Sequence, residues 1–176
     1  MKKHRIPLVL LVILLVASSI LCGTVIAYMF RQTESIDNKF TPAKVSCEVV
    51  EDFDGTQKTS IQVKNTGNID AYLRLRMVSY WVDNEGNIVA KPSVLPEIFV
   101  TSDWIKGPNN TYYYKTTVSP EKQTNSLLSK PIILEKDENG YEQVIEVFAE
   151  AIQSKPHSAV VESWGVDLDT NGYIVP

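Results

Sequence analysis

The sequence predicts an all-β domain, an antiparallel β-sandwich, preceded by an N-terminal apolar helix. Segments in which polar and apolar residues alternate recur from residue 44 to residue 153, and clusters of Asp, Asn, Gly and Pro separate them. Side chains of a strand point alternately to its two faces, so this period indicates strands with one buried face. After the leader, only residues 158–164 have a helical pattern. Seven or eight short strands with almost no helix favour a sandwich of two sheets.

The N-terminus is predicted to be a signal for export. Lys2, Lys3 and Arg5 precede an uncharged run at residues 6–30. A basic region followed by an apolar region is typical of a secretory signal. The run includes Val25-Ile26-Ala27, which has small or β-branched residues at the spacing that a signal peptidase recognises. Cleavage after Ala27 leaves a protein that works outside the cell.

Retention of the leader as a membrane anchor is the alternative to cleavage. About 20 apolar residues span the hydrocarbon core of a bilayer, and residues 6–30 are long enough. Cleavage is favoured by four small or polar residues expected to weaken the helix near the cut: Ser18, Ser19, Gly23 and Thr24. We therefore divide the chain into residues 1–27, a signal peptide or anchor, residues 28–43, an N-terminal arm, and residues 44–176, the β-sandwich domain.

Charge and cysteine content restrict the function of residues 28–176. The leader holds three of the 17 Lys and Arg residues and none of the 21 Asp and Glu residues, so the remainder has 14 basic and 21 acidic side chains. The resulting excess of negative charge argues against nucleic acid as a partner, because phosphate binding needs a basic surface. Cys47 is the single cysteine of this part, so it forms no intramolecular disulfide, and we predict a buried structural thiol.

The first half of the domain is expected to contain three strands. Residues 44–52 alternate up to a turn at Asp52-Phe53-Asp54-Gly55. Residues 58–65 alternate up to a turn at Asn65-Thr66-Gly67-Asn68. Residues 71–82 have the longest alternation and are rich in aromatic and β-branched residues, so they form the strongest strand.

The two faces of residues 71–82 are predicted to differ. One face carries Leu73, Leu75 and Met77 and is expected in the core. The opposite face carries Tyr72, Arg74, Arg76 and Tyr80. We predict a solvated face, on which the arginines pair across strands with acids such as Glu146 or Glu150.

The second half of the domain is expected to continue the sandwich. Residues 83–87 predict a hairpin turn, and residues 91–110, which contain three prolines, predict a long loop with a short packed segment at residues 103–105. Further strands are predicted at residues 88–90, 111–118, 127–134 and 143–153. The third of these contains Pro131, which places it at an edge. The inner face of the last is expected to hold Ile145, Val147, Ala149 and Ala151.

Residues 28–176 contain no evident catalytic constellation. A zinc peptidase needs several converging ligands, such as two histidines four apart on a helix, and this part has the single histidine His157. It also lacks the G-x-S-x-G nucleophile motif and a glycine-rich phosphate loop. We therefore predict that the protein is not an enzyme and has no catalytic, cofactor-binding or metal-binding residues.

Asp167, Asp169 and Asn171 allow two interpretations of the C-terminal segment. With Gly172 they match positions 1, 3, 5 and 6 of a calcium-binding loop. The bidentate acid of position 12 is missing, because the sequence ends at Pro176. A tight turn formed by Asp-Thr-Asn-Gly explains the same residues, and we favour the turn over a weak calcium site.

Aromatic residues also allow two interpretations. Six of them lie on or beside predicted strands, namely Tyr72, Tyr80, Trp81, Tyr112, Tyr113 and Tyr114. They form either an aromatic surface for carbohydrate or protein contact or ordinary strand residues that suit a pleated sheet. We favour the second interpretation.

Several short motifs resemble a family of exported proteins. Residues 23–30, Gly-Thr-Val-Ile-Ala-Tyr-Met-Phe, and the later Asn38-Lys39-Phe40-Thr41 are similar to the G-T-x-A-x-F and N-x-F-T segment of bacterial proteins processed by a SipW-type signal peptidase. Residues 63–74 are similar to their V-x-N-x-G-x-x-x-A-Y-x-R core, and residues 150–153 with Trp164 resemble the end of their domain. Over most of its length the chain resembles the TasA/camelysin-like family of Gram-positive bacteria. It departs from the pattern by an extra residue or two near the cut and by lacking a long C-terminal extension.

The resemblance implies a jelly-roll β-sandwich that polymerises into biofilm matrix fibres. In such fibres the N-terminal segment of one subunit completes the sheet of its neighbour, and residues 28–43 are the expected donor; a flexible tether is the alternative. The implied partners are the protein itself or homologous fibre subunits, a SipW-type signal peptidase, and the membrane during export. Camelysin-type relatives have been described as peptidases, but residues 28–176 lack the ligands that this activity needs, so catalysis is not expected.

Two functions therefore follow from the sequence. The first is an exported structural subunit or accessory of extracellular fibres, at the cell surface or in the biofilm matrix. The alternative is a membrane-tethered surface module that binds wall or matrix polysaccharide. The first predicts polymers that depend on residues 28–43, and the second predicts a monomer with saturable ligand binding.

Overall fold

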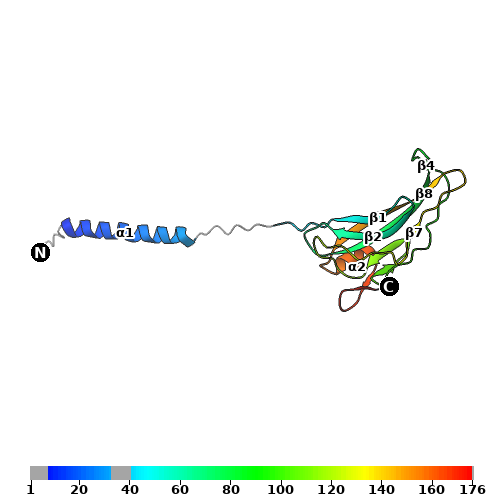
Figure 1. Ribbon diagram of the computed structural model, residues 1–176. Helices are drawn as coiled ribbons and strands as arrows, with labels where there is room; N and C mark the ends of the chain where they lie inside the picture. The colour runs from blue at the N-terminus through cyan, green and yellow to red at the C-terminus, as the bar shows by residue number, and fades with distance from the viewer. Residues whose placement is uncertain (1–7, 33–40, 176) are drawn as a thin grey trace, which may run out of the picture. The chain divides into compact units, whose positions relative to one another are not determined.

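The chain divides into two compact units. The computed structural model describes residues 8–32 and 41–175, and the contacts between residues separate Met1–Thr41 from Pro42–Pro176. Figure 1 shows a long helix in the first unit and a β-rich second unit. The basic residues of the predicted signal and residues 33–40 of the arm lie outside the described residues.

The first unit contains helix α1, Leu8–Gln32. We expected Ser18, Ser19 and Thr24 to weaken this helix near the cut, and the helix is continuous through all three. Their hydroxyls donate to carbonyl oxygens three or four residues earlier, at 2.9 Å in each case, so the helix satisfies these polar groups itself. Among the described residues, no helix is long and apolar enough to cross a membrane.

Three antiparallel strands form the first sheet. In order across the sheet these are β1 (Cys47–Phe53), β2 (Gln57–Asn65) and β7 (Ile132–Ile133). The turn between β1 and β2 begins later than the predicted turn at residues 52–55, because Phe53 still pairs with Lys58.

The second sheet is built around β3, Ala71–Val82. β8 (Glu142–Gln153) pairs with β3 over the full length of both strands, so it occupies one edge of β3. Two short strands, β4 (Ile88–Val89) and β6 (Thr111–Tyr114), share the other edge, and β5 (Trp104–Lys106) pairs with β6. Every pairing is antiparallel, which confirms the predicted all-β, antiparallel fold class.

The main core lies between the two sheets. Leu73, Leu75 and Met77 of β3 are at most 1% exposed and belong to one cluster with Ile61 and Val63 of β2. The predicted core face of β3 is therefore confirmed. Every buried apolar side chain of the described residues belongs to the second unit, so this unit has a hydrophobic core of its own.

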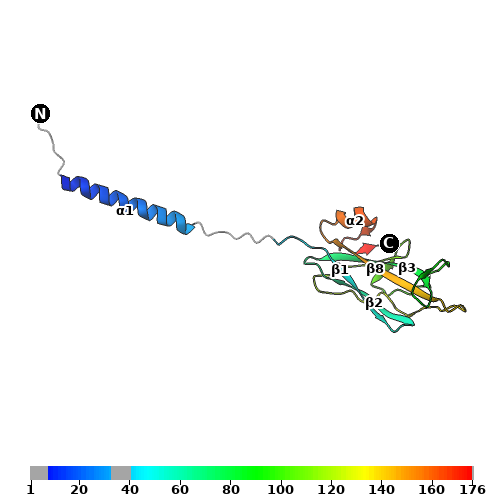
Figure 2. The same cartoon turned by 90° about the horizontal axis from the view of Figure 1, so that it is seen from above.

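A third layer covers part of the opposite face of β3. It consists of helix α2 (Ser158–Trp164) and a hairpin of β9 (Asp167–Leu168) and β10 (Ile174–Val175). Figure 2 shows α2 above the sheet that contains β3 and β8, with β2 on the other side. The helix has its predicted bounds and ends at Gly165, whose φ of 65° is a left-handed conformation that glycine adopts without strain.

The predicted solvated face of β3 is wrong at Tyr72. Tyr72 and Tyr113 are buried in a second apolar cluster with Val160 and Ile174 of the third layer. The Tyr72 hydroxyl donates to the carbonyl oxygen of Gly172 at 2.6 Å, so its polar group is satisfied. Alternation along β3 predicts the two faces but not a helix from a distant part of the sequence that covers one of them.

Two predicted strands are shorter than expected. The strand predicted at residues 111–118 ends at Tyr114, and of residues 127–134 only β7 is regular. Leu127 donates its N–H to the carbonyl oxygen of Ile61 at 2.7 Å, so this segment follows β2 without forming a continuous ladder. Pro131 has no N–H to donate, which prevents a longer strand.

Three hairpin turns share one hydrogen-bond pattern. They begin at Asp83, Asp137 and Asp169. In each, one carboxylate oxygen accepts the backbone N–H groups two and four residues later, at 2.8–2.9 Å. The residue three positions later is a glycine with φ between 78° and 84°, a region that side chains with a Cβ avoid. The aspartate and the glycine therefore define these turns in the sequence.

Acid is expected to destabilise the domain through these turns. The backbone N–H of Asn87 lowers the pKa of Asp83, and the Lys91 ammonium lowers the pKa of Asp137. A carboxylate with a lowered folded-state pKa stabilises the fold fully above its unfolded pKa of about 4, and that stability is lost as pH falls through the folded-state pKa. We expect Asp83→Asn to lower the melting temperature at pH 6 and to reduce its dependence on pH between 6 and 2. Thermal unfolding followed by circular dichroism measures both, with Asp52→Asn as the control outside the turns. An unchanged pH dependence in Asp83→Asn contradicts this account.

Truncation of the core face of β3 gives a second prediction. Leu75 is 0% exposed, and replacing such a leucine by alanine typically costs about 2–5 kcal/mol of unfolding free energy, because a cavity remains. We expect Leu75→Ala in residues 28–176 to lose an amount in this range in urea denaturation. Ile88→Ala, at a side chain that is 73% exposed, is the control and should change stability by less than about 0.5 kcal/mol. Equal losses in both variants contradict the assigned core.

Candidate functional site: two open strand edges

Each of the two sheets ends in a strand with an open edge. Within the described residues β1 pairs only with β2, and β8 pairs only with β3 apart from a bridge between Glu142 and Lys136. The outer edge of β1 and most of the outer edge of β8 therefore have no strand beside them in the described part of the chain.

The backbone groups along both edges point outward. Gln143 of β8 donates its N–H to Glu135, outside the sheet, at 2.8 Å. Because backbone groups alternate in direction along a strand, the N–H and C=O groups of residues 145, 147, 149 and 151 also point away from β3. Directly before β1, the Ser46 carbonyl oxygen accepts a hydrogen bond from the Thr66 N–H on the β2 side. Because backbone groups alternate in direction, those of residues 47, 49 and 51 point away from β2.

The two open edges lie beside each other. Cα atoms of β1 and β8 come within 8 Å of one another without pairing, and the views in Figures 1 and 2 both show the strands as neighbours. At one end of the two strands, the Glu150 carboxylate of β8 is near enough to the Cys47 thiol of β1 to raise its pKa. At the other end, Phe53 of β1 and Ile145 of β8 line one pocket. β1 and β8 therefore run antiparallel to each other.

Apolar side chains lie between the two edges, and we call this strip the β1–β8 seam. Its residues are partly buried and pack against the main core: Cys47, Val49, Val147, Ala149 and Ala151. The residues predicted for the inner face of β8 do point toward the main core, but of these only Ile145 is fully buried. The seam combines outward backbone donors and acceptors with partly exposed apolar side chains. An added β-strand binds to this combination of groups.

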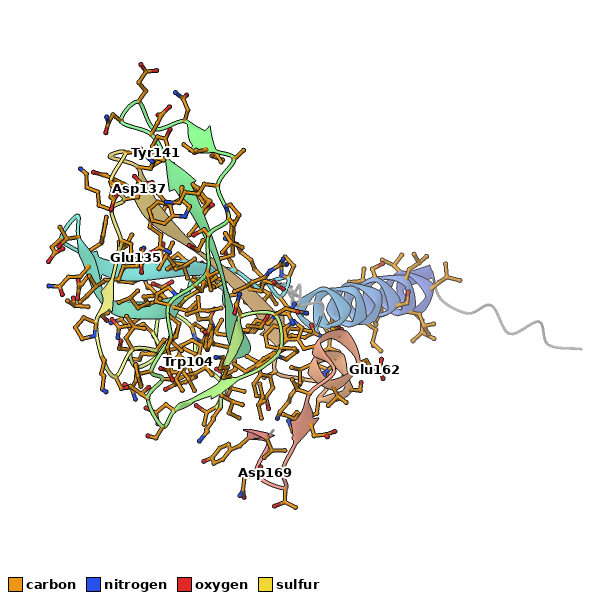
Figure 3. The ribbon with its side chains drawn as sticks, turned by 90° about the vertical axis from the view of Figure 1, so that its right-hand side faces the viewer. Trp104, Glu135, Asp137, Tyr141, Glu162 and Asp169 are labelled. Carbon is orange, nitrogen blue, oxygen red and sulfur yellow. The ribbon has the colours of Figure 1, made fainter. Side chains whose placement is uncertain are left out.

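A pocket of about 430 Å³ lies at one end of the seam. Its apolar wall consists of Phe53, Leu134, Val144 and Ile145. Charged side chains line it as well, including Glu135, and Figure 3 shows Glu135 beside the strands β1 and β2. Phe53 is 50% exposed, and the Lys58 ammonium lies 5.2 Å from its ring centre. An exposed aromatic ring in a partly apolar pocket can accept another apolar side chain.

Cys47 is less buried than the sequence predicted. Its side chain is only partly buried, because it lies on the strand at the open edge of the first sheet. Burial, and to a lesser degree the Glu150 carboxylate, raise the pKa of the Cys47 thiol above its ordinary value. The thiol is therefore a weak nucleophile and lies inside the seam, where it can report on whatever covers the seam.

The aromatic residues do not form an exposed surface. Four of the six that the sequence singled out are at most 6% exposed, namely Tyr72, Trp81, Tyr112 and Tyr113. Their hydroxyl, indole and ring groups are used inside the fold; the Trp81 indole, for example, donates to the carbonyl oxygen of Pro92 at 3.2 Å. The interpretation as ordinary strand residues is the one that agrees with these positions.

The predicted cross-strand pair of Arg74 is confirmed. Arg74 forms an ion pair with Glu150 at 2.6 Å, across the β3–β8 pairing. Its guanidinium also lies 4.6 Å from the ring centre of Trp164. This second contact could not be predicted from the strand alone, because Trp164 comes from α2. Together they hold α2 on the sheet.

The C-terminal segment forms the turn that we favoured. The Asp169 carboxylate accepts the backbone N–H groups of Asn171 and Tyr173 at 2.8 Å each, while Asp167 begins β9. Among the described residues, no group of three or more His, Cys, Asp or Glu side chains is placed to hold a metal ion. His157 lies directly before α2 and makes no capping hydrogen bond through its side chain.

Comparison of the chain with known protein families, with curated proteins and with solved structures gave no match. The assignment of a function therefore depends on the sequence motifs and on the geometry of the seam.

The position of Cys47 in the seam predicts that its thiol is alkylated slowly. We expect iodoacetamide to alkylate Cys47 of folded residues 28–176 at least tenfold more slowly at pH 8 than in urea, because burial disfavours the thiolate and restricts access. The native rate should rise steeply only above the ordinary thiol pKa of about 8.5. Mass spectrometry over a pH series measures this, and equal native and unfolded rates contradict the assigned position.

Proposed function

We propose that the protein is an exported structural subunit, or an accessory, of extracellular biofilm-matrix fibres that assembles by β-strand addition. The observation that carries this proposal is the β1–β8 seam, where two open edges lie beside each other with apolar side chains between them. A strand added along β1 forms backbone hydrogen bonds with that edge and covers partly exposed apolar surface of the seam.

The donor in this proposal is residues 28–43 of a second copy. The arm joins the domain at a defined point, because Asn68 donates to the carbonyl oxygen of Pro42 at 2.9 Å and accepts the N–H of Lys44 at 2.6 Å. It therefore leaves the domain beside the start of β1. Donation from each copy to the next is a contact that does not close, and such contacts propagate into fibres.

Cleavage after Ala27 prepares the arm for this role. Helix α1 extends five residues beyond Ala27, to Gln32. So short a remnant is not stable as an isolated helix, because the first turn is costly to form. Residues 28–32 then become free to extend.

Export, location and family are part of the same proposal. The basic and apolar leader supports secretion, with the membrane and a SipW-type signal peptidase as partners during export and the cell surface or biofilm matrix as the destination. The motifs support membership of the TasA/camelysin-like family, with its jelly-roll strand arrangement. The acidic composition supports a role without nucleic acid, and we propose no enzymatic activity.

Deletion of the arm tests the proposal. Residues 28–176 are expected to form fibres as concentration rises, and residues 44–176 are expected to remain monomeric. Negative-stain electron microscopy and sedimentation measure both. Monomers from both chains contradict self-assembly and favour either the accessory role or a membrane-tethered module that binds polysaccharide.

A substitution within the seam tests the acceptor. Ala149 points into the seam and is partly buried, so Ala149→Lys places a long charged side chain where the donor strand packs. We expect this variant to remain folded and to lose fibres. Phe148→Lys is the matched control, because Phe148 is the next residue of β8 and is 45% exposed. Equal fibre formation by the two variants excludes the seam as the acceptor.

A further inference from the structure

The pocket at the Phe53 end of the seam determines how the donor arm can lie. This inference depends on the proposed function and adds the direction and register of the added strand. We propose that the arm of a second copy runs parallel to β1, with Phe40 in the pocket and Ile36 against Val49.

The direction follows from the positions of the arm and the pocket. Each arm leaves its own domain next to Cys47, the first residue of β1, where Asn68 binds the backbone of Pro42 and Lys44. We call this the Lys44 end of the domain. The pocket lies at the opposite end of β1, at Phe53. A donor that runs from the Cys47 end to the Phe53 end brings its own domain to the pocket end of the acceptor. The Lys44 end of each copy then meets the Phe53 end of the next, which is a head-to-tail contact that continues indefinitely.

The opposite direction does not give a fibre of this kind. A donor running antiparallel to β1 brings its own domain to the Lys44 end of the acceptor, so that two like ends meet. Two copies in that arrangement can exchange arms reciprocally, and a reciprocal exchange closes as a dimer. The direction of the donor strand relative to β1 therefore determines whether the copies form an open polymer or a closed dimer.

When the arm is extended, all of its large apolar side chains after Met29 lie on one face, which they share with Gln32, Glu34 and Asn38. The even positions include Phe30, Ile36 and Phe40, whereas the odd positions from 31 to 41 are all polar or charged. In a strand, even and odd positions lie on opposite faces. The arm can therefore present Ile36 and Phe40 to the core while its other face meets water.

Spacing along the strands sets the register. Phe40 and Ile36 are four residues apart, as are Phe53 and Val49, and four residues of strand span about 13 Å. With Phe40 in the pocket beside Phe53, Ile36 lies level with Val49. There the facing residues of β8 include Ala149, whose small side chain leaves space for a β-branched one.

The size and chemistry of the pocket suit a phenyl ring. Its volume of about 430 Å³ accommodates an aromatic side chain, and its wall includes Leu134 and Val144. The half-exposed ring of Phe53 would be covered by a second ring, and aromatic pairs of this kind are favourable beyond the area that they bury. Phe30 is ten residues from Phe40, about 33 Å in an extended chain, whereas β1 spans about 20 Å. Phe30 therefore lies beyond the seam.

Alanine substitutions in the arm test the register. In residues 28–176, Phe40→Ala is expected to raise the concentration needed for half-maximal polymerisation at least tenfold, and Ile36→Ala should raise it as well. Phe30→Ala is the matched control and should change it less than twofold. Sedimentation across a concentration series measures the shift. All three variants lie outside the folded domain, so loss of folding does not confuse the result.

Crosslinking tests the direction independently. In a Cys47→Ser background, Phe40→Cys combined with Phe53→Cys is expected to give a ladder of disulfide-linked oligomers on mild oxidation. Phe30→Cys with Phe53→Cys is expected to give none. A ladder from the Phe30 pair alone, or only linked dimers, overturns the proposed direction. A linked monomer that forms at every concentration shows that the arm folds back on its own domain, and this also overturns the proposal.

The two levels of proposal fail in different ways. If Phe40→Ala polymerises like the unsubstituted chain while residues 44–176 do not polymerise, strand addition stands and the register is wrong. If residues 28–176 do not polymerise at all, both self-assembly by strand addition and the register are wrong.

Discussion

The pairing of β3 is the constraint on which the rest of the domain depends. Both edges of this strand are occupied, by β8 along its whole length and by β4 and β6 on the other side. Both faces are used, because Leu75 contributes to the main core and Tyr72 to the cluster beneath α2. A shift of one residue in the β3–β8 register exchanges the side chains of the two faces. The pairing of β3 with β8 over their full length therefore determines which side chains of β3 face each of the two neighbouring layers.

Because β3 lies inside its sheet, β8 forms one edge of that sheet, while β1 forms one edge of the other sheet. Open edges are ordinarily a hazard, because unpaired backbone groups attract other chains. Here the two edges lie beside each other, and their facing side chains are small or only partly buried, including Ala149 and Ala151. In the proposed function, one donor strand covers this pair of edges, the β1–β8 seam.

How much of the fold was predictable depends on where the deciding contacts come from. Ala71–Val82 and Ser158–Trp164 have their predicted bounds, because alternation and helical spacing are local properties. Tyr72 was placed wrongly, since α2 lies far from it in sequence. Cys47 was predicted buried and is only partly so, because alternation identifies a face but not which strand ends a sheet. The seam was missed for the same reason, although two alanines on the inner face of β8 were a visible signal of reduced packing.

The direction proposed for the donor strand bears on whether the leader is removed. In that direction the N-terminal end of each arm emerges at the Cys47 end of the acceptor. Only about six residues then separate Ala27 from the seam, and they span about 20 Å when extended. A leader retained in a membrane holds every subunit within that distance of the bilayer. A fibre of such subunits can lie along the membrane but cannot extend away from it. In the proposed fibre, extension away from the membrane therefore requires removal of residues 1–27.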